Sequence, residues 1–182
     1  MLRFPLDDSS SFPVLTTHND LENIPPNYMS NPRNGFWVAV VDKSWLARPN
    51  MVAIVRQLNP MSPSCDKEVI VGSIAIILKP DPSNEPPGSV AWLKRMAVSP
   101  TYRRLGIGAA LTQLALEHCA QAKFRAVELL TTEHHQSAHS LYLSQGFELT
   151  ETIHRRYLGG LISLALLRLR LPCILIRSPS NA

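Results

Sequence analysis

Short apolar runs rich in β-branched residues dominate the first half of the chain. Runs of this kind, bounded by glycine, proline and asparagine, are typical of β-strands. They predict strands over residues 36–41, 69–78 and 90–98, and residues 51–58 are compatible with a further strand segment. Four prolines between Lys79 and Gly88 predict a loop ahead of the strand at 90–98.

The pattern changes in the second half. From Gly108 to Gln121 apolar residues recur about every 3.6 positions, which predicts a helix. Residues 127–131 return to a strand pattern, residues 136–145 form a second helical pattern that Gly146 ends, and residues 147–153 form a last strand. This order of strands, helix, strand, helix and strand predicts an α/β fold with helices packed on a sheet.

The two ends of the chain differ from this middle part, which we place at residues 35–157. Residues 1–34 are rich in proline, serine and asparagine and predict a loosely ordered arm, with at most a short helical turn near residues 20–23. Residues 158–182 form a basic, apolar tail, and after Glu151 the chain has five arginines and no acidic residue. The tail fits either a segment lying on an anionic membrane surface or a final strand and helix that complete the core or a subunit contact.

Composition narrows the class of protein. A chain of 182 residues with 45% apolar residues predicts one globular domain, and a net charge of +4 is too small to indicate a nucleic-acid partner. The three cysteines are far apart and match neither a disulfide framework nor a zinc site, so we expect no metal and a reducing compartment. Neither a secretory signal nor a bilayer-spanning stretch is evident. We therefore expect a cytoplasmic protein, associated with membranes only if the tail binds them.

The most informative stretch is the loop between the strand that ends at Ser99 and the helix that begins near Gly106. It contains Arg103, Arg104 and two glycines, Gly106 and Gly108. Glycine permits close backbone approach, and a helix N-terminus offers unpaired N–H groups and positive charge. Together these features predict an anion site suited to a pyrophosphate. The alternative is an ordinary strand–loop–helix turn; the spacing matches neither a Walker loop nor a dinucleotide fingerprint.

Two stretches resemble motifs of the GCN5-related N-acetyltransferases, the GNAT family. They are MAVSPTYRRLGIG at residues 96–108, which contains the pattern R-x-x-G-x-G, and AHSLYLSQGF at residues 138–147. A narrower resemblance, to the camello-like (N-acetyltransferase 8-like) branch, rests on NDLENIP at 19–25 and FWVA at 36–39. The resemblance covers residues 20–157.

The resemblance implies the GNAT fold, a mixed and mostly antiparallel central sheet with a splayed strand pair and flanking helices. It also implies acetyl-CoA as co-substrate. The backbone of Met96 and Val98 would bind the acetyl carbonyl and pantetheine, and Arg103 and Arg104 would add charge at the entrance. The pyrophosphate would lie on the backbone amides of Leu105, Gly106, Ile107, Gly108 and Ala109.

The resemblance also implies catalytic roles. Tyr142 holds the family's general-acid position; the alternative is a packed helix tyrosine that donates one hydrogen bond. The strand position that often carries a catalytic carboxylate or glutamine is Trp92, which is no base. Glu133 and His134 follow the next strand and are candidates for proton removal, unless they are solvent-exposed loop residues or water relays the proton. His135 lies where the family often has a CoA-contacting asparagine.

We therefore predict an N-acetyltransferase that moves the acetyl group of acetyl-CoA to a primary amine of a small molecule or protein by direct attack. Two alternatives stay open. One is a CoA-binding protein that has lost catalysis, because no base is evident at Trp92 and the segment ahead of residue 36 is short. The other is a membrane-surface or interaction protein that uses the same scaffold.

Overall fold

The computed structural model of this chain describes residues 28, 31–42, 54–57, 68–80, 85–157 and 162–175. The helical turn expected near residues 20–23 lies outside the described residues. All other predicted strands and helices are confirmed within a few residues. In chain order the strands are β1 (Gly35–Asp42), β2 (Ile54–Gln57), β3 (Glu68–Leu78), β4 (Val90–Val98), β5 (Ala126–Thr132), β6 (Glu148–Tyr157) and β7 (Ile162–Pro172). Helix α1 (Ile107–Gln121) connects β4 to β5, and α2 (Gln136–Ser144) connects β5 to β6.

The described strands form one seven-stranded sheet in the order β2-β1-β3-β4-β5-β7-β6. Only β4 and β5 are parallel; every other neighbouring pair is antiparallel. The mixed, mostly antiparallel sheet is therefore confirmed. A parallel pair requires a crossover, and α1 provides it on one face of the sheet.

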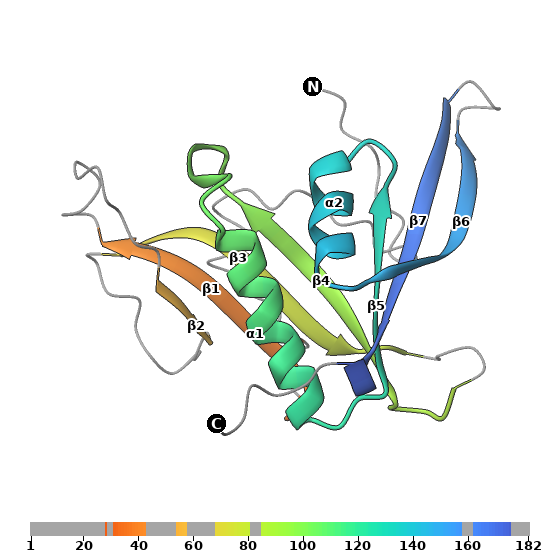
Figure 1. Cartoon of the computed structure of the whole chain (residues 1–182), viewed down its shortest axis with the longest axis horizontal. Coiled ribbons are helices and arrows are strands. Elements are labelled where there is room, and N and C mark those ends of the chain that lie inside the picture. The colour runs from red at the N-terminus through yellow and green to blue at the C-terminus, as the bar shows by residue number, and fades with distance from the viewer. Residues whose placement is uncertain are drawn as a thin grey trace.

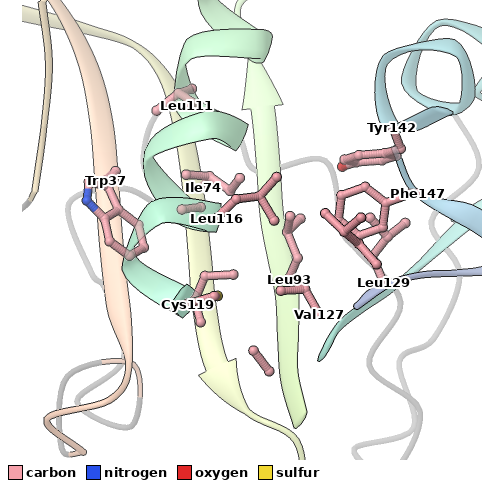
Figure 2. Close-up of a cluster of buried hydrophobic side chains, with 14 of the residues drawn as sticks. Trp37, Ile74, Leu93, Leu111, Leu116, Cys119, Val127, Leu129, Tyr142 and Phe147 are labelled. Atoms are coloured by element: carbon pink, nitrogen blue, oxygen red, sulfur yellow. The ribbon is translucent and has the colours of Figure 1, made fainter. Parts of the chain in front are cut away.

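Both helices cover the same face of the sheet, with α1 across β1, β3 and β4 and α2 beside β5 (Figure 1). The core lies between this face and the helices. Figure 2 shows Leu111, Leu116 and Cys119 of α1 turned toward Ile74 and Leu93 of the sheet. Leu111 and Ile74 are fully buried, and burial of one such side chain stabilises the fold by about 1.5–3 kcal/mol.

The opposite face of the sheet carries a second, smaller apolar cluster. Its members come from β1, from β3 and from Tyr28 ahead of β1, and they are Tyr28, Phe36, Val38, Val40 and Ala75. Alternate residues of a strand point to opposite faces, so β1 is buried on both sides. This explains why its sequence is continuously apolar.

Part of the tail forms a strand of the sheet, which is the second of the two structures expected for it. Residues Ile162–Pro172 form β7, which pairs with β5 on one side and with β6 on the other. Leu169 and Leu171 are buried, while Arg168 and Arg170 pair with carboxylates. The sheet therefore continues beyond residue 157, where we had expected the domain to end. Among the described residues no helix is long and apolar enough to cross a membrane.

Candidate active site

The parallel strands β4 and β5 separate along their length. They pair only where Val90–Trp92 faces Ala126–Glu128. Beyond that point β4 continues to pair with β3 as far as Val98, and β5 continues to pair with β7 as far as Thr132. The expected splayed pair is confirmed. The facing edges of β4 and β5 leave backbone groups outside any ladder, where a ligand can bind them.

A β-bulge decides which backbone groups of β4 face this opening. The register with β3 shifts between Ser73, which faces Ala97, and Ala75, which faces Lys94, so two residues of β4 lie opposite one of β3. Before the bulge, the N–H of Lys79 donates to the carbonyl of Val90 (3.0 Å), and after it the N–H of Ser99 donates to the carbonyl of Val71 (2.8 Å).

The bulge therefore changes the alternation of β4. In the part of β4 before the bulge, the even-numbered residues form backbone hydrogen bonds with β3. In the part after the bulge, the odd-numbered residues form them. Met96 and Val98 consequently direct their N–H and C=O groups away from β3, toward the side where β5 has separated. These are the two residues that we expect to bind the acetyl carbonyl and pantetheine.

The loop after β4 leads into the N-terminus of α1. Gly106 is the N-cap residue of α1, no side chain among the described residues caps this helix, and the first turn of α1 has no acidic residue. The first intrahelical bond runs from the N–H of Ala110 to the carbonyl of Gly106 (3.0 Å). The amides of Ile107, Gly108 and Ala109 therefore have no partner within the helix, as an anion site requires.

The two glycines of this loop are needed for different reasons. Gly106 has φ +78°, a left-handed conformation that glycine adopts freely, and a Cβ there would meet nothing within 4 Å. A Cβ on Gly108 would lie 3.2 Å from Cδ2 of Leu141 and 3.9 Å from Cγ2 of Val98. Gly106 therefore shapes the turn, whereas Gly108 lets α1 approach α2 and the end of β4.

The two arginines of the loop also differ. Arg103 donates from Nε to the carbonyl of Val98 (3.1 Å), so it braces the loop against the end of β4. Arg104 is exposed and has φ +68°, unusual for a residue other than glycine. Since Arg103 occupies one lone pair of the Val98 carbonyl, one remains for a ligand there.

Tyr142 lies on the inner side of α2 and is 4% exposed. Its ring packs edge-on against Phe147, with 5.6 Å between the ring centroids. Figure 2 shows its hydroxyl directed from α2 toward β4. Burial raises the pKa of the Tyr142 phenol, so the group keeps its proton at neutral pH. A proton donor needs this state, although a packed tyrosine would share it.

The turn after β5 carries the three residues named as candidates near the reaction. The Glu133 carboxylate accepts a hydrogen bond from the N–H of Ala165 in β7 (3.2 Å), on the side of β5 away from β4. His134 is largely exposed, with Nε2 3.8 Å from Oε1 of Glu133. His135 precedes α2, and its Nδ1 lies 3.2 Å from Oγ1 of Thr132. The Glu133 contact therefore lies on the β7 side of β5, whereas the His135 contact lies at the end of β5 that has separated from β4.

Comparison with known proteins bears on this arrangement. A model of the Acetyltransferase (GNAT) family matches residues 8–147. The chain belongs to this acetyltransferase family. N-acetyltransferase family 8 member 3 of Rattus norvegicus is 27% identical over 139 residues, which are 76% of this chain and 49% of that protein. N-acetylaspartate synthetase of Homo sapiens is 31% identical over 130 residues, which are 71% of this chain and 33% of that protein. The relatives thus include the predicted camello-like branch, and the match spans half or less of the length of these two proteins.

Solved structures of the same family confirm the fold. A GCN5-related N-acetyltransferase from Kribbella flavida matches with a TM-score of 0.54 and 19% identity, covering 90% of this chain and 80% of that one. The NatC complex bound to Gag peptide and CoA matches with a TM-score of 0.50 and 23% identity, covering 65% of this chain and 69% of that one. At these identities the likeness shows the GNAT fold alone.

One charged cluster in this GNAT domain was missed by the sequence analysis. Glu128, 7% exposed, faces Trp92 at the last paired position of β4 and β5. Its carboxylate accepts hydrogen bonds from Lys79 (2.6 Å) and Arg170 (2.5 Å). Burial alone would raise the pKa of Glu128, but the bonds and charges of Lys79 and Arg170 outweigh it and hold that pKa below its usual range. The group is therefore an ionised structural partner and a poor base.

Lys94 is the charged neighbour of Trp92 on β4. Lys94 Nζ lies 4.1 Å from the centroid of the Trp92 ring. Burial and then the charge of Arg95 lower the pKa of Lys94. Among the residues that the structure describes, no cluster of histidine, cysteine and carboxylate side chains could hold a metal ion.

Proposed function

We propose that this chain is an acetyl-CoA-dependent N-acetyltransferase. The observation that carries the proposal is the opening between β4 and β5, which lies beside an uncapped helix N-terminus. The opening provides backbone groups for an extended thioester, and the helix end provides amides for a diphosphate. Both belong to a chain of the GNAT family.

Binding of acetyl-CoA in this proposal begins at the loop. The amides of residues 105–109 bind the pyrophosphate, Arg104 adds charge, and Arg103 holds the loop against Val98. The pantetheine arm then follows β4, using the backbone of Val98 and Met96. His135, at the start of α2, flanks the same end of β5 and would face the cofactor in place of the family's asparagine.

The reaction in this proposal is direct attack. The neutral amine nitrogen forms a bond to the thioester carbonyl carbon, and the Met96 amide stabilises the resulting oxyanion. The C–S bond then breaks, and the thiolate takes the proton of the Tyr142 hydroxyl, which solvent replaces. The new amide loses its extra proton to a base. The Tyr142 phenol is protonated at neutral pH, as this role requires, and its hydroxyl is directed from α2 toward β4 (Figure 2).

An alkyl ammonium has a pKa of about 10.4, so removal of its proton is a separate requirement. Of the two residues named for it, His134 is the better base, because the Glu133 carboxylate is held by the N–H of Ala165. His134 is exposed and would act through water. His134→Gln tests this role. If the imidazole of His134 removes the proton of the acceptor ammonium, the acidic limb of the pH–rate profile should change in this variant.

The acceptor in this proposal is a primary amine of a small molecule or a protein. One relative is named N-acetylaspartate synthetase, and one solved neighbour is bound to a peptide. Turnover of acetyl-CoA against a panel of amino acids, polyamines and peptides, with the acetylated product identified by mass spectrometry, tests the activity. Acetylation of one class at a rate above the hydrolysis of acetyl-CoA supports it.

A second candidate is a protein that binds CoA without catalysis. Trp92 in the base position and the bond that holds Glu133 on the β7 side favour it. Tight binding of acetyl-CoA in calorimetry with no turnover of any amine in the panel would support this candidate and contradict the enzyme.

A further inference from the structure

A single polar residue interrupts the buried part of β3. Ser73 is 0% exposed and lies between Val71 and Ile74, which are equally buried. A hydroxyl in such a place destabilises the fold unless it has a hydrogen-bond partner. Its Oγ donates to the carbonyl of Arg95 at 3.0 Å. Alanine or valine would suit the apolar surroundings better, so the hydroxyl is explained by that carbonyl.

The Arg95 carbonyl needs a partner because of the bulge in β4. Arg95 and Met96 together lie opposite Ile74, so the regular ladder with β3 is interrupted there. Arg95 has φ +56°, in the left-handed region that a residue with a Cβ adopts at a cost in free energy. The bulge is thus a strained conformation that something must hold.

The side chain of Arg95 is held as well. Its Nε donates to the hydroxyl of Tyr28 at 2.7 Å. Tyr28 is 6% exposed and packs edge-on against Phe36, with 6.0 Å between the ring centroids. Its position is therefore fixed by the apolar cluster on the face of the sheet opposite α1 and α2.

We propose that Ser73, Arg95 and Tyr28 are positioning residues for acetyl transfer. They lock the bulge and thereby select the backbone groups of Met96 and Val98, rather than those of Ala97, to face the opening between β4 and β5. The inference rests on the proposed function, because it assigns the Met96 amide to the thioester carbonyl. Without the bulge, a slip of one residue would restore a regular ladder and turn that amide toward β3.

The test compares Ser73→Ala with Ile74→Val, a core substitution opposite the bulge that lowers stability but removes no side-chain hydrogen bond of the bulge. We expect Ser73→Ala to lower kcat by roughly 10-fold or more, because a misplaced donor loses its effect on the transition state. Its affinity for CoA should fall less than its kcat, because CoA has no acetyl carbonyl for the Met96 amide and loses only its pantetheine contacts. Ile74→Val should keep kcat within about twofold, and Ser73→Thr, which retains the hydroxyl, should recover part of the loss.

Amide hydrogen exchange of residues 95–98 provides a readout that needs no activity. Exchange there should rise in Ser73→Ala and stay unchanged in Ile74→Val. If the wild-type protein neither binds nor turns over acetyl-CoA, the proposed function fails, and normal exchange in Ser73→Ala would still overturn the lock. Equal kcat values for Ser73→Ala and Ile74→Val, or a loss of CoA binding that matches the loss of kcat, would overturn it too.

Tyr28→Phe covers the case in which Ser73→Ala fails to fold, because it removes only the oxygen that accepts from Arg95. We expect a smaller loss of kcat, about threefold, with faster exchange at residues 95–98. A Tyr28→Phe protein with wild-type kcat and wild-type exchange would contradict the role of Tyr28 and Arg95.

Discussion

The two ends of the β4–β5 pair differ in how their polar groups are paired. At the closed end, Trp92 and Glu128 face each other in a regular ladder, and Glu128 is paired with Lys79 and Arg170. At the open end, Met96 and Val98 direct backbone groups into a gap between strands. Charge pairing at one end stabilises the junction, and the lack of pairing at the other leaves room for a ligand. Changes at the closed end should therefore affect stability, and changes at the open end activity.

Removal of residues 158–182 should have the largest effect of all. The deletion takes away β7, so β5 and β6 each lose an antiparallel partner, and Leu169 leaves the core. We expect no cooperative thermal transition by circular dichroism. This result would place the tail in the core rather than on a membrane.

A point substitution makes the same comparison without shortening the chain. Leu169→Ala should lower the free energy of unfolding by about 2–5 kcal/mol in urea titrations. Leu149→Ala, at a leucine that is 49% exposed, should change it far less. Equal effects of the two substitutions would contradict the core position of β7.

Gly108→Glu should impair the binding of acetyl-CoA at the open end without affecting the closed end. A side chain there meets Leu141 and brings a negative charge to the expected pyrophosphate site. We expect Kd for acetyl-CoA to rise by about 100-fold or more in calorimetry, a loss of about 2.7 kcal/mol. Gln121→Glu, at the far, exposed end of α1, adds the same charge and should bind normally. Normal binding by a folded Gly108→Glu protein would remove the loop from the binding site.

Tyr142→Phe separates chemistry from binding at the same end. If the hydroxyl protonates the departing thiolate, kcat should fall by about 100-fold while Kd for CoA stays unchanged. Single-turnover measurement ensures that chemistry, and not product release, is observed. Full activity of this variant would leave Tyr142 as a core residue packed against Phe147.

Glu128→Gln should affect the closed end, where it should lower the free energy of unfolding with little effect on kcat. Removal of one partner of a buried pair should cost about 3 kcal/mol of stability at pH 7. Glu151→Gln breaks the more exposed pair with Arg168 and should cost less than about 1 kcal/mol. If the two variants lose equal stability, the burial of Glu128 has no energetic importance.

The pH dependence sharpens this test. The pKa of Glu128 is lowered in the folded protein, so its contribution is complete above the unfolded pKa of about 4.3. The contribution is lost as the pH falls through the lower, folded pKa. The melting temperatures of the wild-type protein and of Glu128→Gln should therefore converge as the pH is lowered from 5. A difference that stays constant would contradict the lowered pKa of Glu128.

Much of this arrangement follows from local sequence. The glycine loop was predictable because Gly106 acts through its own backbone conformation within a short loop, although the approach of Gly108 to Leu141 of α2 was not. Strand β6 ran four residues past its predicted end at residue 153, because its polar residues continue to pair with β7. A pattern of burial gives no signal for an exposed strand of this kind.

The missed features depend on pairing between distant segments. Lys79 and Arg170 are 49 and 42 residues away from Glu128 in the sequence. The one sequence signal for this cluster was therefore the charged Glu128 within the otherwise apolar strand β5. The bulge at Arg95 exists only in the register with β3. The hydrogen bond from the N–H of Ala165 to the Glu133 carboxylate likewise exists only because β7 lies beside β5 in the sheet.

The place of β7 in the sheet has a consequence for synthesis of the chain. The strands β1, β3 and β4 are neighbours in the sheet in the order in which they are translated, and β2 lies at the edge. Strand β5, in contrast, gains its antiparallel partner β7 only later, because β7 begins 30 residues after β5 ends. Until β7 emerges from the ribosome, β5 has a partner over three residues only. A nascent chain therefore assembles the glycine loop on a nearly finished half-sheet, and the half that holds Tyr142 closes last.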